Sequence, residues 1–74
     1  MRSIHDPRYQ ILIQNLIQLR ESKEMTQVEL ARLLNKPQSY VSKIEILERR
    51  IDVIELIDWV NCLGENLNKI LDRI

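Results

Sequence analysis

The sequence has very few of the residues that make turns. Glycine occurs once, at Gly64, and proline twice, at Pro7 and Pro37. An all-β fold needs many turn residues, so this scarcity argues against a chain of short strands. Leucine, isoleucine, glutamate, glutamine, lysine and arginine dominate instead, and these residues favour helices. The 74 residues suffice for one small domain, which we expect to span residues 1–74.

The chain also lacks the features of a secreted or membrane protein. Its one cysteine, Cys62, has no partner for an internal disulfide, which is typical of a thiol in a reducing compartment. No apolar run approaches the roughly 18 residues of a membrane span, and the start of the chain has no signal-peptide pattern. We therefore expect a cytoplasmic protein with no membrane partner.

Enzyme chemistry finds little support. A single glycine excludes a glycine-rich phosphate loop and a nucleophile elbow. The only histidine, His5, has no plausible metal partners, and acids such as Asp52 and Glu55 are interpreted as helix-surface residues. We expect no catalytic residues, metal, cofactor or small-molecule ligand.

The charges are balanced in total but unevenly distributed. The formal net charge is zero, which counts against nucleic-acid binding, because such domains are often basic. Residues 32–50, however, hold five basic and two acidic side chains, a net charge of +3, and residues 51–74 hold two basic and five acidic, a net charge of −3. This asymmetry suits an anionic partner on one face.

Helix start and stop signals divide the chain into five predicted helices. Asp6 and Pro7 are typical of a helix start, and the first helix is predicted over about residues 7–22. "TQVE" at 26–29 is a capping-box pattern that opens a second helix ending near Leu34. Asn35 tolerates the left-handed conformation of a helix exit, and Pro37 permits a new helix to begin.

The second half of the chain predicts two more helices after the third. Residues 46–50 form a connector, and Asp52 caps a fourth helix that Gly64 ends. This fourth helix is expected to turn the following residues inward: Val53, Leu56, Ile57, Val60 and Leu63. The last residues, "NLNKILDRI", predict a short fifth helix.

Residues 26–45 predict a helix-turn-helix. Two short helices joined by a three- to four-residue turn meet at a steep angle, and the small Ala31 lies where they cross. Four apolar residues would fill that angle: Leu30, Leu34, Val41 and Ile44. The stretch "PQSYVSKIE" then exposes a polar face on the second of these helices, formed by Gln38, Ser39, Tyr40, Ser42 and Lys43. An α-helix of this kind fits the major groove of DNA. Taken alone, without the stretch "TQVELARLLNKP" that precedes it, this polar face would indicate an ordinary solvated helix surface.

Three stretches in order resemble the phage-repressor-like helix-turn-helix family, of Xre or Cro type. They are "MTQVELARLL", "NKPQSYVSKIE" and "ERRIDVIEL", and the resemblance covers about residues 12–74. It implies an all-α fold, a five-helix lambda-repressor-like DNA-binding domain with the helix-turn-helix at helices 2 and 3.

The resemblance also implies roles for individual residues. The positions that read bases are Gln38, Ser39, Tyr40 and Lys43. Gln27 would contact a phosphate and brace the first residue of the third helix. Phosphate contacts are also expected from Lys36, Ser42, Arg49 and Arg50. Arg20 and Glu45 would form a structural ion pair between the first and third helices. The chemistry agrees, because glutamine pairs with adenine through two hydrogen bonds and basic side chains bind phosphates.

Some positions depart from the family pattern. The family often has glycine after the first helix and after "IE", where this chain has Glu24 and Ile46-Leu47. Asn35 replaces the common turn glycine. The exit of the third helix is therefore expected to be more helical or more apolar than usual.

The last two helices carry more apolar residues than one small core needs. They either complete that core or form a two-fold dimer seam over about residues 52–74. We assign Trp59, Cys62, Leu67, Ile70 and Ile74 to the seam. The sequence thus predicts a sequence-specific DNA-binding transcriptional regulator, a dimeric repressor of a palindromic operator in double-stranded DNA. The alternative is a protein-interaction module, antitoxin-like or an adaptor, with weak DNA binding.

Overall fold

The computed structural model describes residues 3–74 and contains no strand among them. Its elements are a 3-10 turn, η1 (Ser3–His5), and five α-helices: α1 (Pro7–Ser22), α2 (Gln27–Leu34), α3 (Gln38–Glu45), α4 (Val53–Cys62) and α5 (Leu67–Leu71). The predicted all-α, five-helix fold is confirmed. None of the helices described over these residues is long and apolar enough to cross a bilayer.

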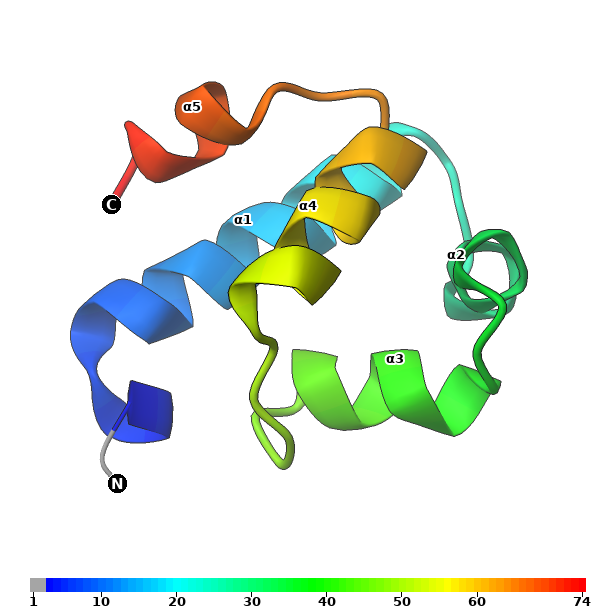
Figure 1. The fold of residues 1–74 in the computed structure, drawn as a ribbon, viewed down its shortest axis with the longest axis horizontal. Helices are drawn as coiled ribbons and strands as arrows, with labels where there is room; N and C mark the ends of the chain where they lie inside the picture. The colour runs from blue at the N-terminus through cyan, green and yellow to red at the C-terminus, as the bar shows by residue number, and fades with distance from the viewer. Residues whose placement is uncertain (1–2) are drawn as a thin grey trace.

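The helices surround one core and leave α3 at an edge. Helix α1 packs against α3 and α5, and α2 packs against α3 and α4. In Figure 1, α4 runs alongside α1 through the middle of the molecule, and α3 lies along the lower border. One side of α3 is therefore covered by the core and the other faces outward.

Reciprocal capping boxes fix where α2 and α4 begin. Thr26 accepts a hydrogen bond from the Glu29 N–H at 3.1 Å, and Glu29 accepts one from the Thr26 N–H at 2.8 Å, so the predicted capping box of α2 is present. Asp52 and Glu55 form the same reciprocal pair at the start of α4, at 2.8 and 3.0 Å. These caps satisfy N–H groups that have no partner within the helix.

Helix α1 begins at the predicted Asp6-Pro7 step. The Asp6 carboxylate accepts from the Arg8 N–H at 2.8 Å and from the Arg8 side chain. Hydrogen bonds from the Arg8 side chain and backbone lower the pKa of Asp6 to about 2. Proline at the first helical position costs nothing, because its missing N–H would have no intrahelical acceptor.

Four helices are each followed by a residue in the left-handed conformation, and only one of these four residues is glycine. The residues with positive φ are Glu24 (56°), Asn35 (57°), Leu47 (66°) and Gly64 (69°). After α1, for example, Glu24 N–H donates to Glu21 O and Met25 N–H donates to Arg20 O, the pair of bonds that defines a Schellman motif. The exit of α3 therefore keeps a glycine-type turn with leucine in it. Of the two expected departures, the exit is more apolar than usual and not more helical.

We predict that Glu24→Gly stabilises the protein by about 0.5–1 kcal/mol. A left-handed residue with a Cβ costs about 1–2 kcal/mol, of which the greater backbone entropy of unfolded glycine takes back about 0.5–1 kcal/mol. Glu24 is exposed, so the change sacrifices no packing. Chemical denaturation measures the effect. Glu24→Ala keeps the Cβ and removes the charge, and an equal gain in that variant would show that backbone strain is not the cause.

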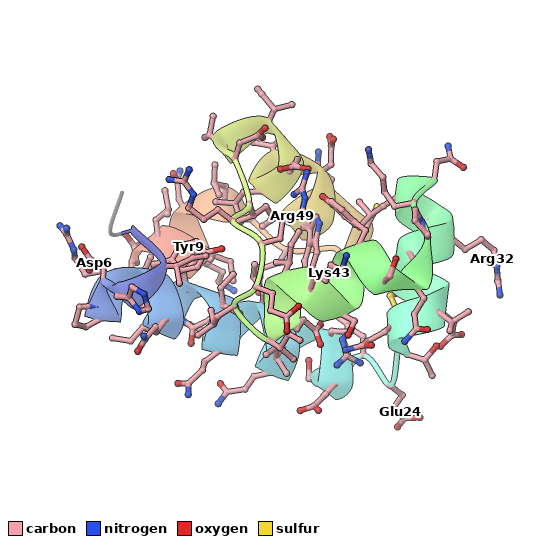
Figure 2. All side chains as sticks on the ribbon, turned by 90° about the horizontal axis from the view of Figure 1, so that it is seen from below. Asp6, Tyr9, Glu24, Arg32, Lys43 and Arg49 are labelled. Atoms are coloured by element: carbon pink, nitrogen blue, oxygen red, sulfur yellow. The ribbon has the colours of Figure 1, made fainter. Side chains whose placement is uncertain are left out.

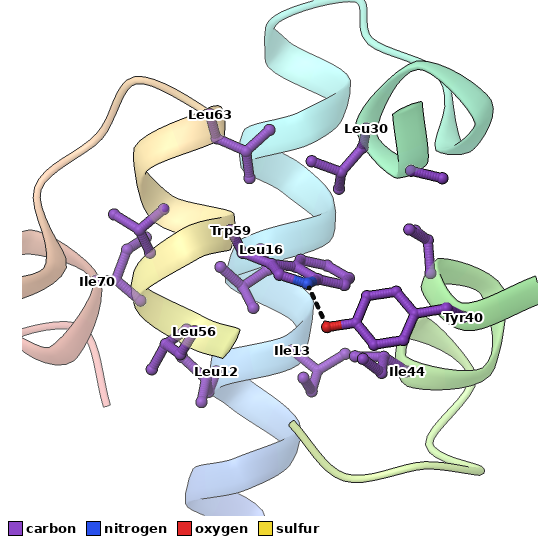
Figure 3. Packing of buried hydrophobic residues seen from close by; sticks show 13 residues of the cluster. Leu12, Ile13, Leu16, Leu30, Tyr40, Ile44, Leu56, Trp59, Leu63 and Ile70 are labelled. Carbon is purple, nitrogen blue, oxygen red and sulfur yellow. Dashed lines mark hydrogen bonds between the residues drawn. The ribbon is translucent and has the colours of Figure 1, made fainter. Parts of the chain in front are cut away.

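The core lies between α1, α3 and α4, with α2 and α5 closing its ends (Figure 3). Trp59 of α4 and Leu16 of α1 lie at its centre and are both 0% exposed. The hydrophobic residues that complete the buried set are Leu12, Ile13, Leu30, Ala31, Tyr40, Val41, Ile44, Leu56, Val60, Leu63 and Ile70. Burial of this set supplies the main driving force for folding.

Two residues of α4 point away from the core, contrary to prediction. Val53 is 62% exposed and Ile57 is 36% exposed. The inward face of α4 follows Leu56, Val60 and Leu63, at the four- and three-residue spacings of one helix face. Ile57 lies off this line, and Val53 continues it but is the first residue of α4, so α4 presents apolar side chains to solvent as well.

Candidate nucleic-acid interface

The outward side of α3 is polar. Val41 and Ile44 point into the core and are 0% exposed. Gln38, Ser39 and Lys43 are exposed on the opposite side, and Ser42 is half-buried beside them. Figure 2 looks at this side of the molecule, and Lys43 lies on the near face of α3. The helix thus presents hydrogen-bonding groups on a convex surface of the kind that enters a major groove.

A chain of hydrogen bonds holds the first residue of α3 in place. Arg20 Nε and Nη2 donate to the Glu45 carboxylate at 2.7 and 3.0 Å, and both side chains are largely buried. Gln27 Nε2 donates to the same carboxylate at 2.7 Å. Gln38 Nε2 then donates to Gln27 Oε1 at 3.0 Å. The expected ion pair between α1 and α3 is present, and Gln27 connects it to the start of α3.

Tyr40 does not belong to the outward face, and its assignment as a base-contacting residue is corrected. It is only 9% exposed and shares a helix face with the buried Ile44, four residues later. Its hydroxyl accepts from Trp59 Nε1 at 3.2 Å and donates to Glu55 Oε2 at 3.0 Å. The dashed line in Figure 3 shows the bond to Trp59. Burial raises the pKa of the Tyr40 hydroxyl, so it remains protonated.

Two cations that precede and follow α3 lie over the Tyr40 ring. Lys36 Nζ is 5.4 Å from the ring centroid and the Arg49 guanidinium carbon is 4.9 Å from it. Arg49 also pairs with Glu55 at 3.1 Å. Such cation–π contacts fix the position of a charge without neutralising it. Lys36 and Arg49 remain exposed, so both expected phosphate contacts lie at the surface.

The other expected phosphate contacts differ in exposure. Arg50 is exposed, whereas Gln27 and Ser42 are half-buried. Gln27 already uses both ends of its amide, Nε2 toward Glu45 and Oε1 toward Gln38. The structure therefore shows the expected contact by which Gln27 braces Gln38, the first residue of α3.

The residues assigned to a dimer seam divide into two groups. Trp59 and Ile70 are 0% and 1% exposed and belong to the core of their own chain, so their assignment to a seam is wrong. Cys62 and Leu67 are half-buried, and Ile74 is 41% exposed. Sequence periodicity does not distinguish the inner from the outer side of a helix that is apolar on both.

Sequence reasoning misses two features near α3. The sequence indicates a surface acid at Glu55, but its carboxylate contacts Tyr40, Arg49 and the Asp52 N–H. Its place three residues after Asp52 is the capping-box signal that identifies part of this role. The second feature is Ile46. The sequence indicates only a connector residue there, whereas in the structure it is an apolar side chain with 56% exposure next to the polar side of α3. Its spacing from Ser39 and Lys43 continues the outward side of α3.

Glu55 remains ionised in this setting. Burial would raise its pKa, but hydrogen bonds from the Asp52 N–H, from Arg49 and from Tyr40 outweigh burial, and the pKa lies below its usual value. A negative charge therefore lies at the start of α4, beside the connector that joins α3 to α4.

Two helices joined by a tight turn, with the second buried on one side and polar on the other, define a helix-turn-helix DNA-binding domain. Comparison with known proteins gives the family. A family model described as "Helix-turn-helix" matches residues 16–70. The chain is also similar to the solved structure of an XRE-family like protein from Pseudomonas syringae pv. tomato str. DC3000. The two share 44% sequence identity and a TM-score of 0.88, over 96% of this chain and 87% of that one. No curated protein matches the chain.

The chain belongs to the XRE-type helix-turn-helix family. The family comprises DNA-binding regulatory domains and not enzymes, so this chain is a DNA-binding transcription regulator whose partner is double-stranded DNA.

Proposed function

We propose that the protein reads a specific DNA sequence with the outward side of α3. The observation that carries the proposal is the exposure of Gln38, Ser39 and Lys43 on one side of a helix that Gln27 braces at its start. A glutamine with two hydrogen bonds to adenine, or a lysine bonded to guanine, discriminates against the wrong base by about 1–3 kcal/mol. The proposed phosphate contacts around this helix are Lys36, Arg49, Arg50, Gln27 and Ser42.

We further propose that the protein acts as a homodimeric repressor of a palindromic operator. One helix-turn-helix reads few base pairs, and two copies reading half-sites about 34 Å apart reach useful affinity. Blocking a promoter requires only occupancy of the operator. A repressor therefore needs no surface beyond those of DNA binding and dimerisation.

The outer side of α4 is the surface that best supports a dimer. Val53 and Ile54 are 62% and 63% exposed, and Ile57 follows one turn later at 36%. Together with Asn61 they form an uncharged row at helical spacing. A two-fold interface places one surface against its own copy, and an uncharged row brings no like charges together. Cys62, Leu67 and Ile74 belong, like α4, to the C-terminal half of the chain, and we place them at the edge of this proposed interface.

Ile54→Glu is predicted to shift the protein from dimer to monomer. The substitution places two carboxylates at the centre of the proposed two-fold interface, where each would have to lose its hydration. Analytical ultracentrifugation measures the effect. Ile11→Glu is the matched control, because Ile11 is an isoleucine of α1 with 40% exposure. A wild-type monomer, or equal dissociation in both variants, would contradict this interface.

Selection from a random duplex library tests the DNA proposal. Bound sequences are expected to converge on a palindrome, and affinity should fall with salt by a log–log slope of about 0.9 for each phosphate neutralised. Repression is tested by placing the selected site over a reporter promoter. Absence of retention at low salt would instead favour a protein-interaction module that uses the apolar side of α4.

A further inference from the structure

The carboxylate of Glu55 joins three segments of the chain. Its Oε1 accepts from the Asp52 N–H at 3.0 Å and so caps α4. Its Oε2 accepts from the Tyr40 hydroxyl at 3.0 Å and lies 3.1 Å from Arg49 Nη1. The cap alone explains only the first contact. The other two link α4 to α3 and to a basic residue beside it.

Arg49 is an exposed side chain held in one place. It retains 44% exposure, yet its guanidinium lies against the Tyr40 ring, and its Nη1 also donates to Arg50 O at 3.1 Å. In Figure 2 the Arg49 label lies next to α3, on the side of the molecule that carries Lys43. An arginine in solution samples many rotamers, and ordering it on binding costs free energy. In this protein, folding has already ordered it.

We propose that Glu55 is a positioning residue for DNA binding, whose carboxylate holds Arg49 against Tyr40 in the orientation that meets a DNA phosphate. The inference rests on the proposed function, in which this side of the molecule contacts DNA. Arg49 makes the contact, and Glu55 acts through it. Arg49 keeps hydrogen-bond donors for a phosphate, because a guanidinium has five N–H donors and Glu55 contacts the Nη1 end.

Charge alone predicts the opposite effect for Glu55. A carboxylate near a bound phosphate repels it, so removing the carboxylate should strengthen DNA binding. Positioning predicts that removing it weakens binding, because Arg49 must then be ordered during association. The two explanations therefore differ in the sign of one measurement.

Glu55→Gln is the variant that separates them. The single carbonyl oxygen of glutamine can still accept from the Asp52 N–H in a capping box. Its amide nitrogen then faces the Tyr40 hydroxyl and donates to it, in place of the bond that Glu55 accepted, so the interaction lost without replacement is the ion pair with Arg49. We expect an affinity for the selected duplex about two- to tenfold lower, which is the cost of immobilising one long side chain. The salt slope should stay unchanged, since Arg49 still neutralises its phosphate. Thermal unfolding checks that the variant is folded at the assay temperature.

Two comparisons complete the experiment. Glu48→Gln removes an exposed carboxylate next to Arg49 in sequence and is expected to leave affinity equal or higher. Arg49→Gln is expected to weaken binding and to lower the salt slope by about 0.9, and adding Glu55→Gln to it should cause no further loss. If Glu55→Gln binds as tightly as wild type or more tightly, the positioning proposal is overturned while DNA readout by α3 stands. If wild type shows no sequence preference, the proposed function itself fails.

Discussion

Replacing Glu45 by alanine is expected to lower the free energy of unfolding by about 3–5 kcal/mol. The Arg20 and Glu45 side chains are 11% and 5% exposed. Removing one member therefore leaves the other charge buried without its partner. A domain this small lies toward the low end of the ~5–15 kcal/mol stability range of native proteins, so the variant should be largely unfolded or close to it. Circular dichroism during urea denaturation measures this directly.

The same substitution should also impair DNA binding under conditions in which the variant is folded. Gln27 loses its acceptor on Glu45, and the start of α3 loses the brace that runs from Gln27 to Gln38. Glu48→Ala is the control, because that glutamate is exposed. Its replacement should change stability by less than ~0.5 kcal/mol, as is usual for surface substitutions. A Glu45→Ala protein with wild-type stability and affinity would show that the buried network is not required.

Trp59→Ala is the second substitution with a large expected effect, about 3–5 kcal/mol of lost stability. The indole is 0% exposed at the centre of the core, so alanine leaves a cavity there. Its ring packs edge-on against Tyr40, with centroids 6.2 Å apart, and that favourable aromatic contact is lost as well. Urea denaturation again gives the value. A soluble, folded variant with altered association state and unchanged stability would return Trp59 to a dimer seam.

Tyr40→Phe is the comparison that isolates the hydroxyl. It keeps the ring beneath Arg49 but removes the acceptor of the buried Trp59 N–H. An unsatisfied buried donor costs about 1–3 kcal/mol of stability. DNA affinity of the folded protein should change little. Unchanged stability with lost affinity would place the hydroxyl on DNA and contradict the core assignment.

The order of the helices could be predicted from the sequence because their ends carry local signals. Asp6, Thr26, Asn35 and Gly64 each act on backbone groups within a few residues. The exit of α3 was not predictable in this way. Leucine has no preference for positive φ, and Leu47 adopts that conformation because its half-buried side chain packs against the core. Tertiary packing there outweighs local preference.

The site was predictable where it depends on spacing and unpredictable where it depends on which side of a helix faces inward. Gln38, Ser39 and Lys43 are outward because Val41 and Ile44 are inward. A tyrosine is polar at one end only, so the residue type at position 40 fits a base contact and a core position equally well. The same ambiguity affects α4, which is apolar on two sides, and only the packing against α1 and α2 decides between them.

The most direct test of DNA readout by α3 compares wild type with Gln38→Ala in parallel selections from one random duplex library. Gln38 is exposed, and the one hydrogen bond that its side chain donates, to Gln27, also lies at the surface, so the variant should lose about 0.5–1.5 kcal/mol of stability at most and remain folded. We predict a defined sequence preference for wild type, and for the variant a loss of discrimination confined to one position in each half-site, of about 1–3 kcal/mol. Identical preferences and affinities for the two proteins would contradict readout through this side of α3.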